Sequence, residues 1–225
     1  MTTGLDPAVL TATRESLHRV AEHLLAATRK RATGKISLQP WPGGFGTPQL
    51  PDGTALRVDG ADFVVTRPAA ERKQPLATLA QAAAFAGVPA GFPWTKHPPT
   101  TPFEPEAPLT VDPAAAAALA GWFQLGEKAL KTLAGELAAE KPSKQELWPE
   151  HFDLAITAGA VNYGFSPGDE TIATPYVYVG PHEPPTSGEL WNAPFGAFRT
   201  WDDLRDAAAA LAFLRSGHDS ARGKR

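Results

Sequence analysis

The stretch of sequence that decides the fold runs from Trp148 to Gly180 and holds three segments: WPEHFDLA (148–155), NYGFSPGD (162–169) and PYVYVG (175–180). From Phe152 onward, apolar residues alternate with polar or small ones, and in the third segment tyrosine alternates with valine. This period of two is typical of a strand that buries one face. Pro167-Gly168 supplies the central residues of a type II turn at the end of the second segment. The stretch therefore predicts three strands of a mainly antiparallel sheet.

Helices are predicted on both sides of these strands. A long helix should run from Asp112-Pro113 to about Glu140, because an aspartate cap followed by proline starts a helix and Lys141-Pro142 ends one. After the strands, Thr200-Trp201-Asp202-Asp203 resembles a capping box and predicts an amphipathic helix through Leu214.

The N-terminal half has the same order of elements. Asp6-Pro7 predicts a helix that ends at Gly34, and Asp59-Gly60 predicts a hairpin turn. The Pro- and Gly-rich segment 40–48 is expected to be a loop, and residues 75–85 a short helix. The strands predicted here are 35–39, 56–58 and 63–65. The sequence thus indicates an α+β fold, with a mainly antiparallel sheet, helices on one face and two similar helix–three-strand–helix halves.

The halves are expected to share one core. Neither half has enough strands to bury both of its helices alone, so we predict a single α+β domain over residues 1–216. The Pro-rich connector 88–111 should then pack across this domain. Residues 217–225 are polar and predict a flexible tail.

Composition excludes several classes of protein. A net charge of −3 gives no field that would favour nucleic acid or a membrane surface as a partner. The chain has no cysteine, which excludes disulfides and thiolate chemistry and fits the cytoplasm. No segment is apolar enough to span a bilayer, and no signal-peptide pattern is present. The high Pro, Gly and Ala content favours a bacterial source, and the sequence does not indicate an oligomeric state.

The polar residues of the central stretch predict a small-ligand pocket floored by the sheet. His151 and Asp153 are two positions apart and are expected to project from one face, opposite Phe152, where they should meet Tyr176. Such pockets combine apolar walls with a few polar groups. The expected ligand-binding residues are His151, Asp153, Asn162, Tyr163, Tyr176, Tyr178 and Trp148.

Two other classes of function stay open. A hydrolase or lyase, with or without a metal, would use His151 as base and Asp153 to orient it. A metal needs three or more converging ligands and only two are placed here, so structural roles are favoured and no metal or cofactor is expected. A protein-interaction module would instead use the connector 88–111. His18 and His23, five residues apart on the first helix, are expected on the helix surface.

Two blocks of the central stretch resemble the sequence of a bacterial domain-of-unknown-function family. They are Trp148-Pro149-x-His151-Phe152-Asp153-Leu154-Ala155 and Gly164-Phe165-x-Pro167-Gly168-Asp169. Members of this family also carry a Leu-His helix and a Gly-Lys-Val/Ile strand, matched here by Leu17-His18 and Gly34-Lys35-Ile36. Where the family has a Trp/His-rich second segment, this chain has Trp41-Pro42-Gly43-Gly44-Phe45. The resemblance spans nearly the whole chain and implies no activity.

Overall fold

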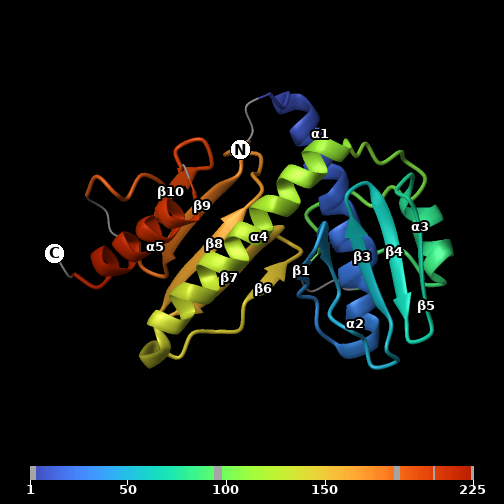
Figure 1. Cartoon of the computed structure of the whole chain (residues 1–225), viewed down its shortest axis with the longest axis horizontal. Helices are drawn as coiled ribbons and strands as arrows, with labels where there is room; N and C mark the ends of the chain where they lie inside the picture. The colour runs from blue at the N-terminus through green and yellow to red at the C-terminus, as the bar shows by residue number, and fades with distance from the viewer. Residues whose placement is uncertain (1–3, 94–97, 185–187, 205, 224–225) are drawn as a thin grey trace. The chain divides into compact units, whose positions relative to one another are not determined.

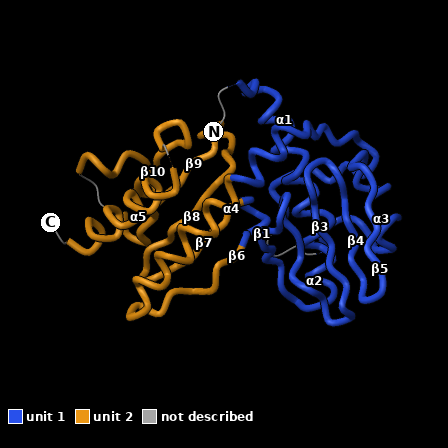
Figure 2. Tube along the Cα trace, in the orientation of Figure 1, with its two compact units in different colours: residues 1–121, 147–152 blue, residues 122–146, 153–225 orange. Residues whose placement is uncertain are grey.

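The computed structural model describes residues 4–93, 98–184, 188–204 and 206–223. These residues form two compact units, shown in different colours in Figure 2. The first unit holds residues 1–121 and 147–152, and the second holds 122–146 and 153–225. They contain two five-stranded antiparallel sheets (Figure 1). The α+β class and the two similar halves predicted from the sequence are confirmed, with five strands in each sheet where three were expected.

The first unit begins with one continuous helical rod that contains a π-helical turn. Asp6 caps its start by accepting a hydrogen bond of 2.8 Å from the amide of Ala8, and Gly34 ends it with a φ of 77°. Its apolar residues recur at helical spacing and are buried: Leu17, Val20, Ala21, Leu24 and Leu25. The rod consists of α1 (Pro7–Val20), the π turn η1 (Ala21–Ala26) and α2 (Ala27–Thr33).

The first sheet is a simple meander in which each strand pairs with the next along the chain. The segment 40–48, expected to be a loop, instead forms a two-stranded hairpin. Its glycines permit this, because a Cβ atom on Gly44 would lie only 2.3 Å from the carbonyl oxygen of Val58 on the neighbouring strand. The predicted turn at Gly60 is present, with a φ of 61°. The strands are β1 (Gln39–Trp41), β2 (Gly44–Gly46), β3 (Ala55–Asp59), β4 (Asp62–Arg67) and β5 (Ala70–Pro75).

A short helix follows the sheet and starts later than predicted. Pro75 ends β5, and the helix α3 (Leu79–Ala86) begins only after Thr78, whose hydroxyl oxygen accepts a hydrogen bond from the amide of Gln81. Gly87, with a φ of 72°, ends it. The connector 88–111 then leads to α4 (Pro113–Glu136), which is capped by Asp112 as predicted.

The second sheet has the strand order β10-β9-β8-β7-β6. The three central strands fall in the predicted segments, whereas β6 and β10 were not predicted. The last helix starts after the cap Asp206 and not at Thr200. The hydroxyl of Thr200 instead donates a hydrogen bond to Asp203. The remaining elements are η2 (Ala138–Glu140), β6 (Glu146–Trp148), β7 (Asp153–Ala158), β8 (Val161–Ser166), β9 (Tyr176–Pro181), β10 (Ala197–Thr200) and α5 (Ala207–Ala221).

Helices cover one face of the second sheet, as predicted (Figure 1). A Cβ atom on Gly126 of α4 would lie 2.7 Å from the ring of Phe165, and one on Gly217 of α5 would lie 2.5 Å from Val179. The tail predicted from residue 217 is therefore wrong in part, because α5 continues to Ala221 with Gly217 buried. Residues 224 and 225 lie outside the described residues.

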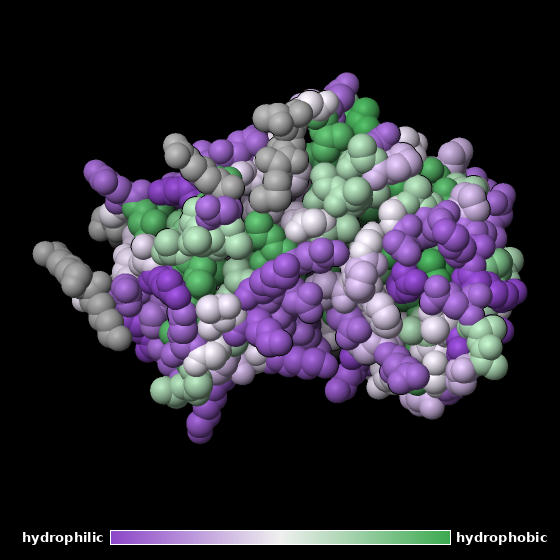
Figure 3. All heavy atoms as spheres, viewed as in Figure 1, coloured by the Kyte–Doolittle hydropathy of each residue, from purple (hydrophilic) through white to green (hydrophobic). Residues whose placement is uncertain are grey.

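The surface of both units is rich in hydrophilic residues on the face that Figure 3 shows. Val9, Phe103 and Phe195 are the large apolar residues that are exposed among those described. No helix in the described ranges is long and apolar enough to cross a membrane.

Candidate functional site

One pair of predicted site residues, Asp153 and Tyr178, is joined directly on the second sheet. The hydroxyl of Tyr178 donates a short hydrogen bond to Oδ2 of Asp153. Strand β8 runs between the two, and the tyrosine ring crosses it at Gly164, where a Cβ atom would lie 2.5 Å from the ring. Burial, with the negative charge of Asp153 close by, raises the pKa of Tyr178 well above its usual value. The phenol is therefore the proton donor in this pair.

Tyr176 makes a second tyrosine–aspartate pair on the same face of the sheet. Its hydroxyl donates to Oδ2 of Asp169 at 2.6 Å, and Oδ1 of Asp169 accepts from the amides of Thr171 and Ile172. The rings of Tyr176 and Tyr178 are 6.1 Å apart. The strand register places both tyrosines and Asp153 on one face, as the alternation predicted.

His151 does not share that arrangement. Strand β7 starts at Asp153, and Phe152 before it has a φ of 50°, in the left-handed region. The alternation assumed for residues 151–153 therefore does not apply, and the expectation that His151 and Asp153 project from one strand face is wrong. His151 is exposed in a turn of the first unit, and Trp148 is half-buried at the end of β6.

Asn162 and Tyr163 lie on opposite faces of β8. Oδ1 of Asn162 accepts a hydrogen bond of 2.7 Å from the hydroxyl of Thr157 on the next strand. Tyr163 is buried on the helix side, where its hydroxyl is 2.7 Å from Nδ1 of His218, while Nε2 of His218 is 3.2 Å from Glu140. The expected place of Tyr163 beside Tyr176 is therefore wrong, and the three groups tie α5 and η2 to the sheet.

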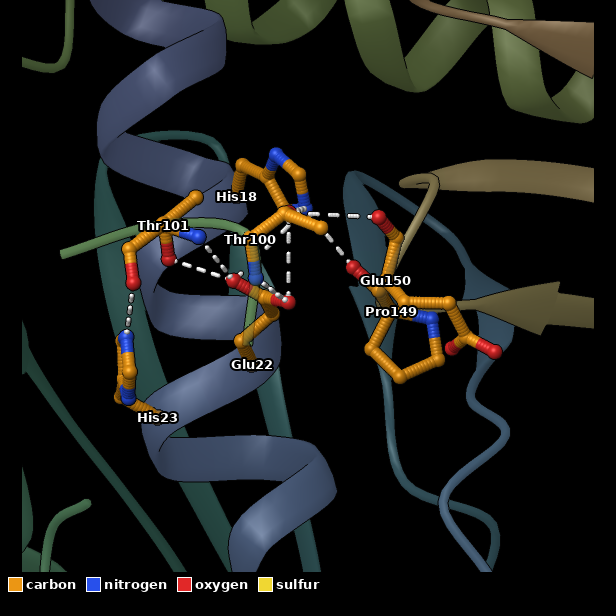
Figure 4. A network of polar contacts seen from close by, with 7 residues as sticks. All are labelled: His18, Glu22, His23, Thr100, Thr101, Pro149 and Glu150. Carbon is orange, nitrogen blue, oxygen red and sulfur yellow. Dashed lines mark hydrogen bonds and ion pairs between the residues drawn. The ribbon is translucent and has the colours of Figure 1, made fainter. Parts of the chain in front are cut away.

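A polar network that the sequence did not predict lies in the first unit and centres on Glu22 (Figure 4). This carboxylate is buried and accepts hydrogen bonds from the amides of Thr100 and Thr101, both at 2.8 Å. The two threonine hydroxyls also donate to it, at 3.3 and 2.5 Å. Four donors stabilise the buried charge and fasten the connector to the helix.

Two histidines flank this carboxylate. Nε2 of His18 lies 2.7 Å from the carbonyl oxygen of Pro149 and 3.9 Å from Glu22, and its ring stacks on Phe152 at 5.2 Å. Nε2 of His23 lies 3.0 Å from the carbonyl oxygen of Thr101. The prediction of two surface histidines is wrong, because His23 is buried and His18 nearly so. Glu22 and His23 both fall in the π turn, a feature that often marks functional sites.

Burial sets the charge state of His18. It lowers the pKa of His18, and this effect outweighs the nearby negative charge of Glu22, which raises it. The neutral ring then carries its hydrogen on Nε2, because a carbonyl oxygen can only accept. Within the described residues, no three His, Asp or Glu side chains gather as a metal site would require. Hydrogen bonds thus hold this network together.

Two cavities lie next to the same helical rod. The smaller, of about 370 Å³, is lined by His23, Thr101, Arg31 and Phe103 among others. The larger has a volume of about 640 Å³ and is here named the arginine cavity. Its lining residues are Thr28, Arg31, Ala32, Leu50, Pro51, Asp52, Thr54, Leu56, Arg67, Pro68, Ala86, Gly87, Val88 and Pro89.

The arginine cavity combines an apolar wall with two guanidinium groups. Arg31, in the last turn of α2, donates to the carbonyl oxygens of Pro89 and Gly91 at 3.0 and 2.6 Å. Arg67, at the end of β4, donates to the carbonyl oxygen of Ala86 at 3.0 Å. The two arginines therefore fix the segment that follows α3 and bring positive charge to the cavity.

Comparisons with protein-family models, with curated proteins and with solved structures give no match. The resemblance indicated by the two central blocks thus stays a prediction.

The functional groups that the sequence missed come from elements distant in the chain. Glu22 does not fall among the apolar positions of the first helix, and its charge alone predicts an exposed side chain. It is buried because the connector covers it at Thr100 and Thr101. The available signal for this network was the position of Glu22 itself, one helical turn after His18 and on the same side of the helix. Arg31 and Arg67 carried no signal, because only the fold brings them to one cavity.

Proposed function

We propose that this protein is a binding module that holds a small molecule in the arginine cavity of its first unit. The observation that carries the proposal is the cavity itself. Its volume of about 640 Å³ falls in the range of about 300–1,000 Å³ that small-molecule sites occupy. Leu50, Pro51 and Val88 give it an apolar lining, and a few polar groups can fix the orientation of a ligand.

The sheet face of the second unit is a weaker candidate for the ligand site. Its polar groups already satisfy one another, since Tyr178 binds Asp153 and Tyr176 binds Asp169. A ligand would have to replace these hydrogen bonds, at a desolvation cost for each group.

An enzymatic role for His151 and Asp153 also has less support than ligand binding. A base and its orienting carboxylate must be held in hydrogen-bond reach, and the alternation that suggested this is interrupted at Phe152. The cysteine-free composition supports a reducing compartment such as the cytoplasm for the binding module.

A fluorescence titration with phenylnaphthylamine, a neutral and apolar probe, tests the proposal. The protein should bind one equivalent with saturation. Val88→Trp places an indole in the half-buried wall of the cavity and should weaken binding about tenfold or more.

Val9→Trp is the matched control, because Val9 is exposed on α1 and does not line the cavity. Circular dichroism of both variants checks their fold. Absence of saturable binding, or equal binding by the two variants, would overturn the proposal.

A further inference from the structure

The hydrogen-bond acceptors of the two cavity arginines carry no negative charge. Arg31 and Arg67 donate to carbonyl oxygens, which are neutral. Other arginines differ in this respect: Arg57 is paired with Asp59 and Glu71, and Arg215 with Glu136. The cavity thus brings two guanidinium groups to one apolar wall.

The carboxylate on the lining, Asp52, does not cancel this charge. It is exposed, and its oxygen accepts a hydrogen bond of 2.9 Å from the amide of Thr54. This hydrogen bond, with the positive charge of Arg67 as a smaller contribution, lowers the pKa of Asp52. Arg31 and Arg67 are exposed as Asp52 is, so solvent screens the three charges alike. The lining residues carry two positive charges against this one, so the cavity favours an anion.

Both guanidiniums have donors to spare. Each carries five N–H groups in a planar fork that matches carboxylate and phosphate oxygens. The carbonyl contacts use two hydrogen bonds of Arg31 and one of Arg67. These contacts also hold the forks in place, which lowers the ordering cost of binding a ligand.

From this geometry we infer that the ligand of the arginine cavity is a small organic anion, with an apolar body against Leu50, Pro51 and Val88 and one anionic oxygen group at Arg31 and Arg67. The inference rests on the proposed function, since it names the class of molecule that the same cavity binds. Carboxylate, sulfonate and phosphate share the chemistry that the forks recognise.

The test compares two probes that differ by one anionic group. Anilinonaphthalene sulfonate has the ring system of phenylnaphthylamine with a sulfonate added. In fluorescence titrations the sulfonate probe should bind about tenfold or more tightly than the neutral one. That advantage should shrink as salt is added, because ionic contacts are screened.

Substitutions assign the effect to the cavity. Arg67→Gln should remove most of the advantage of the sulfonate probe over the neutral probe, while Arg31 keeps the remainder. Arg67→Lys should give an intermediate affinity because it keeps charge without the fork. Arg72→Gln is the matched control. Arg72 donates to the carbonyl oxygen of Phe85 at 2.9 Å, as Arg67 does to that of Ala86, but it does not line the cavity.

Failure of the anion inference can be told apart from failure of the proposed binding function. If phenylnaphthylamine binds and the sulfonate probe binds no tighter, or if Arg67→Gln and Arg72→Gln behave alike, the anion inference is overturned and the binding module stands. If neither probe binds, both fall. Should Arg67→Gln fail to fold, the comparison of probes on the unaltered protein and on Arg67→Lys decides the matter.

Discussion

Tyr178 donates a hydrogen bond to Asp153 across Gly164, over the strand that separates their own strands in the sheet. Asp153 is buried, and the glycine lets the tyrosine ring lie on the backbone of β8. The pair therefore fixes three strands against one another in the second unit.

Tyr178→Phe should lower the free energy of unfolding by about 1–3 kcal/mol, because it removes a donor from a buried carboxylate. Tyr176→Phe should cost less, since Asp169 keeps the amides of Thr171 and Ile172 as donors. Replacing the exposed His151 with alanine should change stability by less than about 0.5 kcal/mol. Urea denaturation measures all three, and a loss in Tyr178→Phe no larger than that in Tyr176→Phe would contradict the structural role of the pair.

Two glycines of α4 should respond oppositely to alanine. Gly126→Ala places a methyl group 2.7 Å from the ring of Phe165 and should destabilise by about 1–3 kcal/mol through overpacking. Gly135 has nothing within 4 Å of such a methyl group, so Gly135→Ala should stabilise the helix by about 0.5–1 kcal/mol. Thermal unfolding of the two variants gives the signs, and equal signs would argue against close packing of α4 on β8.

His18 should make stability depend on pH. Its pKa is lowered in the folded protein, so the unfolded chain binds a proton more readily. The stability contributed by neutral His18 is fully present above the unfolded pKa of about 6.5 and is lost as pH falls from there through the folded pKa. Denaturation at several pH values should show the wild type losing stability relative to His18→Gln over this window.

An exposed, uncharged position of the same helix provides the control for that measurement. Val9→Gln adds and removes no titratable group and should keep the pH profile of the wild type. A stability difference between wild type and His18→Gln that does not change with pH would contradict the buried, neutral state of His18.

Cleavage of the connector should not release two folded fragments. Both ends of the connector, residues 88–111, belong to the first unit. Glu22 of the same unit binds the connector at Thr100 and Thr101. Limited proteolysis there should give a nicked protein that migrates as one species in size-exclusion chromatography. Recovery of two separate folded fragments under native conditions would contradict the single domain predicted from the sequence.

Periodicity predicted the parts of the fold that are long or strongly alternating. The helical rod, α4 and the three central strands of the second sheet follow from apolar spacing and from the Asp-Pro caps. The strands β1, β2, β6 and β10 are three or four residues long, which is too short for a period to show. Strand β5 reads AERKQP, an exposed and charged edge strand without an apolar face.

The sequence predicted the site residues whose position follows from the alternation of side chains along a strand. It missed those that only the tertiary fold brings together. Asp153, Tyr176 and Tyr178 share a face because all three lie within regular strands. His151 was misplaced because nothing in the sequence shows that Phe152 adopts a positive φ. The arginine cavity draws its walls from four separate segments, 28–32, 50–56, 67–68 and 86–89, and local sequence patterns do not connect them.

The most direct test of the binding module is an amide chemical-shift map of the protein titrated with phenylnaphthylamine. The account predicts that the largest shifts fall on the lining of the arginine cavity, with Thr28, Arg31, Thr54 and Val88 among them. Shifts concentrated on strands β7 and β9, with the cavity residues unchanged, would place the ligand on the tyrosine face and contradict the account.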